Sequence, residues 1–164
     1  RFKIIASNLP KKGIVYSSPL SRAKKTYMMS KKNGLCIKRY KLDIRLAEQN
    51  LGEWTGMKYK DLEQLTKKLN VYTPNWLMEG TYKPPGGESF IELTRRVKSF
   101  IEEMIRKFPK ENIIIFSHGG PIRAALSLAL KYYKGKVLPI EINNLSITHI
   151  NYFKSNWCIQ RTNY

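Results

Sequence analysis

The chain has few of the residues on which disulfide, metal and membrane-spanning structures depend. Its 164 residues include only two cysteines and two histidines. Cys36 and Cys158 are too few for a disulfide scaffold, so we expect a reducing, cytoplasmic setting. Two histidines and two cysteines without close spacing do not make a usual zinc site, and no dinucleotide or triphosphate loop occurs, so we expect neither metal nor cofactor. No apolar run approaches the roughly 18 residues of a membrane span, so we expect no membrane partner.

Acidic residues are also scarce. Against 12 Asp and Glu stand 30 Lys and Arg, which gives a formal net charge of +18. A field this positive attracts anions, among them nucleic acids and phosphorylated small molecules. There is no basic stripe interleaved with stacking aromatics, which argues against a dedicated nucleic-acid surface. We therefore interpret the charge as lysines scattered over solvated faces, compatible with a small phosphorylated substrate.

The residues that are present indicate one folded domain. Hydrophobic residues make up 42 % of the chain and aromatics 12 %, and this length suffices for a core. Strand-like and helix-like patterns alternate. We expect strands at 14–17, 35–40, 113–116, 145–152 and 157–161, and helices ending at 9 and covering 20–29, 59–69, 90–108 and 122–133, with an irregular insert at 74–87. This alternation predicts an α/β fold, a three-layer α/β/α arrangement with a mainly parallel central sheet.

Two predicted strands lead into residues that suit phosphate chemistry. The site of a parallel sheet lies beyond the carboxyl ends of its strands. Ser18 follows the first strand, and Arg22 lies in the first turn of the next helix, where its guanidinium could hold two phosphate oxygens. His118 follows strand 113–116 and precedes Gly119 and another glycine at a helix start, where backbone N–H groups favour an anion. We interpret His118 as functional.

A third candidate comes from a polar loop. Glu48 would be a proton donor if the loop lies near these cations. Taken alone, both Glu48 and Arg22 are more readily explained as solvated surface residues.

Four segments in order make a more specific pattern. They are Val15 to Ala23 with Thr26, Leu46 to Gly56, Pro84 to Ser89, and Ile115 to Gly120 with Arg123. With these segments the chain resembles the histidine phosphatase superfamily, which has the phosphoglycerate mutase-like fold, over nearly its whole length. It looks most like the small α-ribazole phosphatase-type branch.

The resemblance implies a metal-independent phosphomonoester hydrolase that works through a phosphohistidine. By it, Arg22 would clamp the phosphoryl group, Glu48 would be the general acid, and His118 would donate a hydrogen bond to a phosphoryl oxygen. The remaining residues implied in phosphate or substrate binding are Ser18, Gly119, Glu88 and Arg123.

The chain departs from the family at the nucleophile. The family's reacting histidine belongs to an Arg-His-Gly motif after the first strand, and the sequence has no such motif. The other histidine, His149, lies in a predicted late strand, and we interpret it as structural. The chain also begins with Arg1, so the resemblance predicts a single domain over 1–164 without its first strand and catalytic loop. Because that strand is central, we expect a chain that folds poorly, recruits a strand or belongs to a longer molecule.

Three functions stay open at this point. The first is the phosphatase, the second an inactive phosphate-binding or interaction protein on the same fold, and the third, weaker one nucleic-acid binding driven by charge. A homodimer is compatible with each. The substrate is open as well, because the side chains of Trp76, Met78, Tyr82 and Phe90 could wall the site's mouth or pack in the core.

Overall fold

The computed structural model describes residues 1–74, 77–132 and 137–164. Its central sheet has three parallel strands in the order β2-β1-β3. These are β1 (Ile14–Ser17), β2 (Tyr40–Leu42) and β3 (Ile113–Phe116). All four residues of β1 are buried, as expected of a central strand that is covered on both faces.

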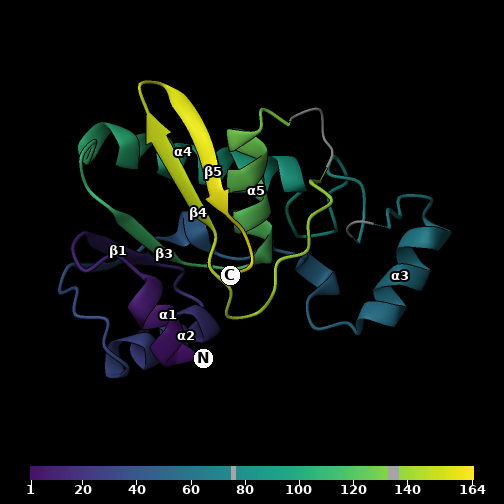
Figure 1. Cartoon of the computed structure of the whole chain (residues 1–164). Coiled ribbons are helices and arrows are strands. Elements are labelled where there is room, and N and C mark those ends of the chain that lie inside the picture. Colours follow the sequence, from purple (N-terminus) through teal and green to yellow (C-terminus); the bar gives the residue numbers. More distant parts are fainter. Residues whose placement is uncertain (75–76, 133–136) are drawn as a thin grey trace.

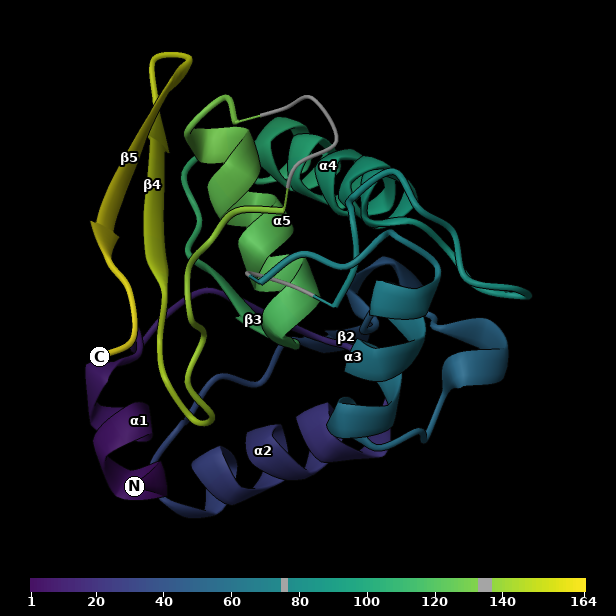
Figure 2. The same ribbon diagram turned by 90° about the vertical axis from the view of Figure 1, so that its right-hand side faces the viewer.

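Helices cover both faces of this sheet. α1 (Phe2–Asn8) and α2 (Ser21–Lys32) lie together on one face, and α4 (Phe90–Lys107) and α5 (Gly119–Ala129) lie on the other (Figure 2). Ala23 and Tyr27 of α2 pack against Val15 and Phe116, whereas Phe100 of α4 packs in a second cluster with residues of the opposite side of β1. The predicted three-layer α/β/α fold is confirmed.

Two elements lie outside the three layers (Figure 1). α3 (Tyr59–Lys68) packs Leu62 against Trp54 and Met78. β4 (His149–Phe153) and β5 (Asn156–Arg161) form a separate antiparallel hairpin, which contacts α5.

The edge of β3 that faces away from β1 is free within the described ranges. β3 pairs with β1 alone there, and Ile115 is 41 % exposed although the run Ile113–Phe116 is entirely apolar. A free apolar edge of this kind is a ready acceptor for another strand.

Several predicted boundaries were wrong. Of the predicted strand 35–40, only Tyr40 belongs to β2: burial of Leu35 and Ile37 alternates as in a strand, but pairing to β1 begins with the Arg39 carbonyl. The late strand begins at His149 and not at 145, because Leu145 has the left-handed φ of 57°, which extended strands exclude.

The third difference concerns the helix after β3. It begins at Gly119, three residues earlier than predicted, with the extended residue His118 at its N-cap. The glycine pair is therefore the first turn of the helix itself, which brings its backbone N–H groups to the site. The helix also ends at Ala129 and not at the predicted Tyr133, which lies outside the described residues. Lys131, just beyond the helix, has the left-handed φ of 53°.

The aromatic and thioether side chains around the insert belong to the core. Residues 77–87 consist of turns, bends and irregular backbone. Met78 is 1 % exposed, Phe90 is 3 % exposed, and the Tyr82 ring stacks on Trp54 at 5.6 Å between centroids. These side chains therefore pack internally instead of walling the site, and Trp76 lies outside the described residues.

Among the described helices, none combines the length and the apolar character that crossing a bilayer requires.

The packing of α4 on β1 allows a test of the core. Phe100 is fully buried and meets the Tyr16 ring edge to face at 5.1 Å. We expect Phe100→Ala to lower the free energy of unfolding by about 3–5 kcal/mol, because it leaves a cavity and removes the ring contact. Urea denaturation followed by circular dichroism measures this. Lys98→Ala, an exposed change on the same helix, should stay within about 0.5 kcal/mol, and equal losses would contradict this account of the core.

Candidate active site

Parallel pairing brings two of the predicted segments together. Ser17 at the end of β1 is in register with Phe116 at the end of β3, and the Ser18 N–H donates to the Phe116 carbonyl at 2.9 Å. The residues that follow each strand, Ser18 and His118, therefore meet at the carboxyl edge of the sheet. This is the edge at which the sequence predicted the site.

His118 is held between two of the predicted site residues. Arg22 Nε donates to His118 Nδ1 at 2.9 Å, and His118 Nε2 lies 2.8 Å from Ser18 Oγ. Because Nδ1 accepts from a guanidinium, the network assigns the ring proton to Nε2, which donates to Ser18. Ser18 Oγ also accepts from the Leu20 N–H at 3.2 Å.

The surroundings of His118 favour its neutral form. The ring is buried, with 7 % of the residue exposed. Burial is the main cause that lowers the pKa of His118, to about 4, and the positive charges of Arg22 and Arg96 add to it. Removing a cation from water and placing other cations beside it both penalise the imidazolium. At neutral pH, His118 is therefore uncharged.

Glu48 is anchored at the N-terminus of α5. Its Oε1 accepts from the backbone N–H of Gln49 at 2.9 Å and of Gly120 at 3.1 Å. A negative side chain is stabilised by the positive end of the helix dipole. A Cβ on Gly120 would overlap this carboxylate oxygen, so a larger residue there would displace the Glu48 side chain from its present place. The helix start that the sequence assigned to a substrate anion thus holds the carboxylate of Glu48.

Arg123 lies one turn along the same helix. Its Nε donates to the Ile140 carbonyl at 2.9 Å. Burial lowers the pKa of Arg123, and the negative charges of Glu48 and Glu141 oppose that shift. A Cβ on Gly119 would lie 3.0 Å from Arg123 Nη1, so the guanidinium lies close to the first turn of α5.

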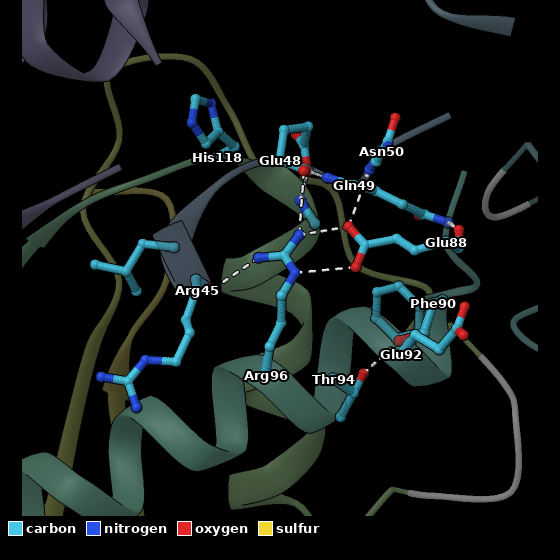
Figure 3. A network of polar contacts seen from close by, with 12 residues as sticks. Arg45, Glu48, Gln49, Asn50, Glu88, Phe90, Glu92, Thr94, Arg96 and His118 are labelled. Carbon is cyan, nitrogen blue, oxygen red and sulfur yellow. Dashed lines mark hydrogen bonds and ion pairs between the residues drawn. The ribbon is translucent and has the colours of Figure 1, made fainter. Parts of the chain in front are cut away.

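Sequence reasoning missed the arginine that fixes the Glu48 loop. Arg96, on α4, forms a bidentate ion pair with Glu88. The distances are 3.0 Å from Nε to Oε2 and 2.6 Å from Nη2 to Oε1. It also donates to the backbone carbonyls of Arg45 at 2.7 Å and Glu48 at 3.1 Å. Figure 3 shows these four bonds converging on one guanidinium. The available signal was an arginine directly beside the apolar stripe of Leu93 and Val97.

Glu88 completes this clamp from the other side of the loop. Its Oε1 accepts from the Asn50 N–H at 2.9 Å, and its carbonyl accepts from Gln49 Nε2 at 2.9 Å. The carboxylate predicted to bind phosphate or substrate is engaged here with Arg96 and the loop backbone. Glu88 and Arg96 together hold the segment 45–50 that carries Glu48.

No group of three or more His, Cys, Asp or Glu side chains within 1–74, 77–132 and 137–164 is arranged to hold a metal ion. The site instead combines Arg22, Ser18 and His118 with the anchored carboxylate of Glu48.

Comparison with known proteins gives this geometry a family context. The family model for the histidine phosphatase superfamily (branch 1) matches residues 6–164. A metal-independent phosphoserine phosphatase of Arabidopsis thaliana is 30 % identical over 145 residues, which are 87 % of this chain and 60 % of that protein. A bifunctional protein of Mycobacterium tuberculosis is 31 % identical over 135 residues, 81 % of this chain and 36 % of that protein. The chain thus spans less than two thirds of these curated relatives.

Solved structures share the fold. A mycobacterial glucosyl-3-phosphoglycerate phosphatase in complex with inorganic phosphate superposes with a TM-score of 0.78 at 22 % identity, covering 99 % of this chain and 84 % of that one. A candidate α-ribazole-5'-phosphate phosphatase of Escherichia coli gives a TM-score of 0.76 at 18 % identity, covering 99 % and 79 %. The resemblance to phosphoglycerate mutase-like phosphatases is confirmed.

The low pKa of His118 predicts how stability depends on pH. The folded value of about 4 lies below the unfolded value of 6.5, so the unfolded chain binds this proton first. The contribution of neutral His118 is complete above pH 6.5 and is lost as the pH falls toward 4, by about 3 kcal/mol in total. Urea denaturation between these pH values measures the loss, and His118→Asn controls for other groups. Parallel pH profiles for the two proteins would contradict the assignment.

The clamp on the Glu48 loop predicts a difference between adjacent arginines. Arg96→Met leaves the partly buried Glu88 carboxylate without its ion-pair partner, so we expect a loss of about 2–3 kcal/mol in the free energy of unfolding. Arg95→Met, the same change at an exposed position, should cost less than about 0.5 kcal/mol. Chemical denaturation of both variants decides it: equal effects would show that Arg96 does not hold the loop.

Proposed function

Because the chain belongs to the histidine phosphatase superfamily (branch 1), we propose that the protein hydrolyses a small phosphomonoester without a metal ion, through a phosphohistidine. The observation that carries the proposal is the hydrogen-bonded set of Arg22, His118 and Ser18 next to the anchored carboxylate of Glu48. A phosphoryl-transfer site needs cationic donors for the equatorial oxygens and a proton source for the leaving group, and these residues supply both.

Phosphate binding and the charge of His118 would be coupled. The guanidinium of Arg22 donates to His118 without ligand, and a phosphoryl group would compete for it. The same anion would stabilise the imidazolium and raise the pKa of His118. His118 could then take a second proton and donate from Nδ1 to a phosphoryl oxygen as negative charge develops.

Glu48 would first have to take up a proton on its carboxylate, and in that protonated form it would deliver the proton to the leaving oxygen. The backbone donors of Gln49 and Gly120 fix its carboxylate, and the Arg96–Glu88 clamp fixes its backbone. A donor that is already positioned loses little entropy in the transition state.

The nucleophilic imidazole needs a source other than His118, whose ring nitrogens are both engaged. We place it on a strand that adds to the free edge of β3. Two observations support this placement: β3 is paired on one side only among the described residues, and Ile115 is exposed on that apolar strand. A residue at the end of such a strand would lie beside His118 at the same sheet edge.

A second function follows from one specific observation. The sequence has no Arg-His-Gly motif, and a chain that no strand completes would bind phosphate at Arg22 without turnover. The relatives are named for phosphoserine and glucosyl-3-phosphoglycerate, so we propose a small, anionic phosphoester as the ligand in either case. A net charge of +18 favours such ligands.

Hydrolysis of p-nitrophenyl phosphate in the presence of EDTA tests the first function. We expect turnover to fall by at least about 100-fold in His118→Ala and in Arg22→Ala, because each removes a donor to the phosphoryl group. His149→Ala, a change of the other histidine at an exposed strand end, should leave the rate within about twofold. Full activity in His118→Ala would overturn the assignment of His118.

Two further measurements separate the alternatives. An acid-labile phosphoenzyme formed from a labelled phosphodonor supports the phosphohistidine route. Phosphate binding by calorimetry that depends on Arg22, without turnover or phosphoenzyme, supports the inactive phosphate-binding protein. Absence of both phosphate binding and turnover in a folded protein contradicts both functions.

A further inference from the structure

The basic charge of the protein is concentrated on one side of the sheet. Residues 1–42, which form α1, β1, α2 and β2, contain no aspartate or glutamate. In the same stretch stand the following lysines and arginines: Arg1, Lys3, Lys11, Lys12, Arg22, Lys24, Lys25, Lys31, Lys32, Lys38, Arg39 and Lys41. Of the ion pairs formed within the described residues, the one that reaches this stretch joins Arg39 to Glu111 across 3.2 Å at an exposed position.

The opposite layer is different, because it carries glutamates that pair with part of its cations. On α4, Glu103 pairs with Lys107 and Arg45, Glu102 with Lys98, and Glu92 with Lys83. The sheet therefore separates a layer whose positive charge is partly compensated by glutamates from a layer in which α1 and α2 carry no acidic residue. The sequence suggested lysines scattered over the surface, and the fold gathers them.

Exposed apolar side chains are interleaved with these cations. α2 turns Ala23, Tyr27 and Ser30 toward the core, so Met28 lies on its outer side, where it is 57 % exposed, with Met29 39 % exposed beside it.

Lysines at both ends of the helix surround the two methionines. Lys25 and Lys32 share the outer side with Met28 by helical spacing, and Lys24 and Lys31 flank it. On α1, which covers the same face of the sheet (Figures 1 and 2), Ile4 is 59 % exposed next to Lys3. We call this surface the α1–α2 face: Lys3, Ile4, Lys24, Lys25, Met28, Met29, Lys31 and Lys32.

We propose that the α1–α2 face docks the protein on an anionic lipid surface. Lysines near a negatively charged leaflet are attracted to it, and aliphatic or thioether side chains between them can enter the boundary between headgroups and acyl chains. The proposal departs from the sequence expectation of no membrane partner. That expectation rested on the absence of a membrane span, which peripheral docking does not need.

The side chains on this face favour lipid over nucleic acid. Proteins that bind single strands place aromatic rings where bases can stack on them. The aromatic side chains of this layer are turned inward instead: Tyr27 and Tyr40 stack on each other at 4.0 Å between centroids, and the Tyr27 ring also meets Phe116. What is exposed between the lysines is Ile4, Met28 and Met29.

Vesicle co-sedimentation tests the proposal with the full chain. One set of vesicles is pure phosphatidylcholine, and the other contains about 30 % phosphatidylserine, which gives the negative surface potential. We expect binding to the second set only, with an affinity that falls at least about tenfold between about 50 mM and about 200 mM salt as the charges are screened. Equal binding to both sets overturns the proposal.

Two matched variants locate the contact. Substituting Lys24→Gln, Lys25→Gln, Lys31→Gln and Lys32→Gln together should weaken binding by at least about 100-fold, since each lysine contributes to the attraction. The control removes the same number of charges from α3 and its N-cap residue, by Lys58→Gln, Lys60→Gln, Lys67→Gln and Lys68→Gln. Asp61 and Glu63 stand among those lysines, and Lys67 is paired with Glu63, so we expect a loss of less than about threefold. Equal losses would show that net charge alone drives binding, which overturns the proposal.

Two further experiments test the apolar contribution to lipid binding and the alternative partner, nucleic acid. Met28→Ser with Met29→Ser keeps every charge and should weaken vesicle binding at least about fivefold, because two side chains no longer enter the lipid. Unchanged binding in this variant overturns the proposed insertion of these side chains.

The same protein is also tested for binding to single-stranded RNA and duplex DNA at equal salt. Nucleic-acid binding would overturn the lipid assignment if it is tighter than vesicle binding and if the fourfold lysine variant of α2 abolishes it. Circular dichroism of each variant confirms that it is folded.

Discussion

Pairing between β1 and β3 is the contact on which the rest of the structure depends. The two strands run parallel and in register from Ile14 and Ile113 to Ser17 and Phe116, so their carboxyl ends stop at the same level. Everything that follows either strand begins at that edge. The turn into α2 delivers Ser18 and Arg22, and the turn into α5 delivers His118 and the helix N-terminus that holds Glu48.

The sheet built on this pairing also separates two helical layers, of which only one contains acidic residues. α1 and α2 carry cations without acidic neighbours, whereas α4 carries glutamates that pair with lysines and arginines. The site lies at the boundary, where the two layers meet at the end of the sheet. Arg22 comes from the basic layer, and Arg96 reaches the Glu48 loop from the other. Burial is the main cause that lowers the pKa of His118 and keeps its ring neutral, and the positive charges of Arg22 and Arg96, one from each layer, add to it.

Much of the fold could be predicted from local patterns. The apolar stripe of α4 has the helical period, and Ser89 with Glu92 forms the capping box that starts this helix. The continuous apolar run of β3 indicated a strand, which is confirmed, but it also indicated burial on both faces, whereas Ile115 is 41 % exposed. The strand prediction for 35–40 was wrong because side-chain burial and backbone pairing do not coincide there. The side chains of Leu35 and Ile37 are buried in the alternating pattern of a strand, but their backbone does not pair with β1.

The site was predictable only in part, for a related reason. Arg22, His118 and Glu48 stand in recognisable local contexts, because a strand end, a glycine turn or a polar loop is a property of adjacent residues. Arg96 stands in no such context. Its partners are the Glu88 carboxylate and the carbonyls of Arg45 and Glu48, which are separated from it by up to 51 residues along the chain.

The sequence by itself determined the class of fold, the order of its elements and the three side chains that suit phosphate chemistry, because hydrophobic period and turn chemistry are written locally. Its composition also shows how few cysteines, histidines and acidic residues the protein has. Only the tertiary structure decided where the remaining charge lies. Hydrogen bonds to the His118 ring and the clamp on Glu48 arise between segments distant in sequence. The acid-free stretch 1–42 is visible in the sequence, and only its packing decides that α1 and α2 present their lysines on one face of the sheet. Such contacts depend on how helices pack on the sheet, which no single segment specifies.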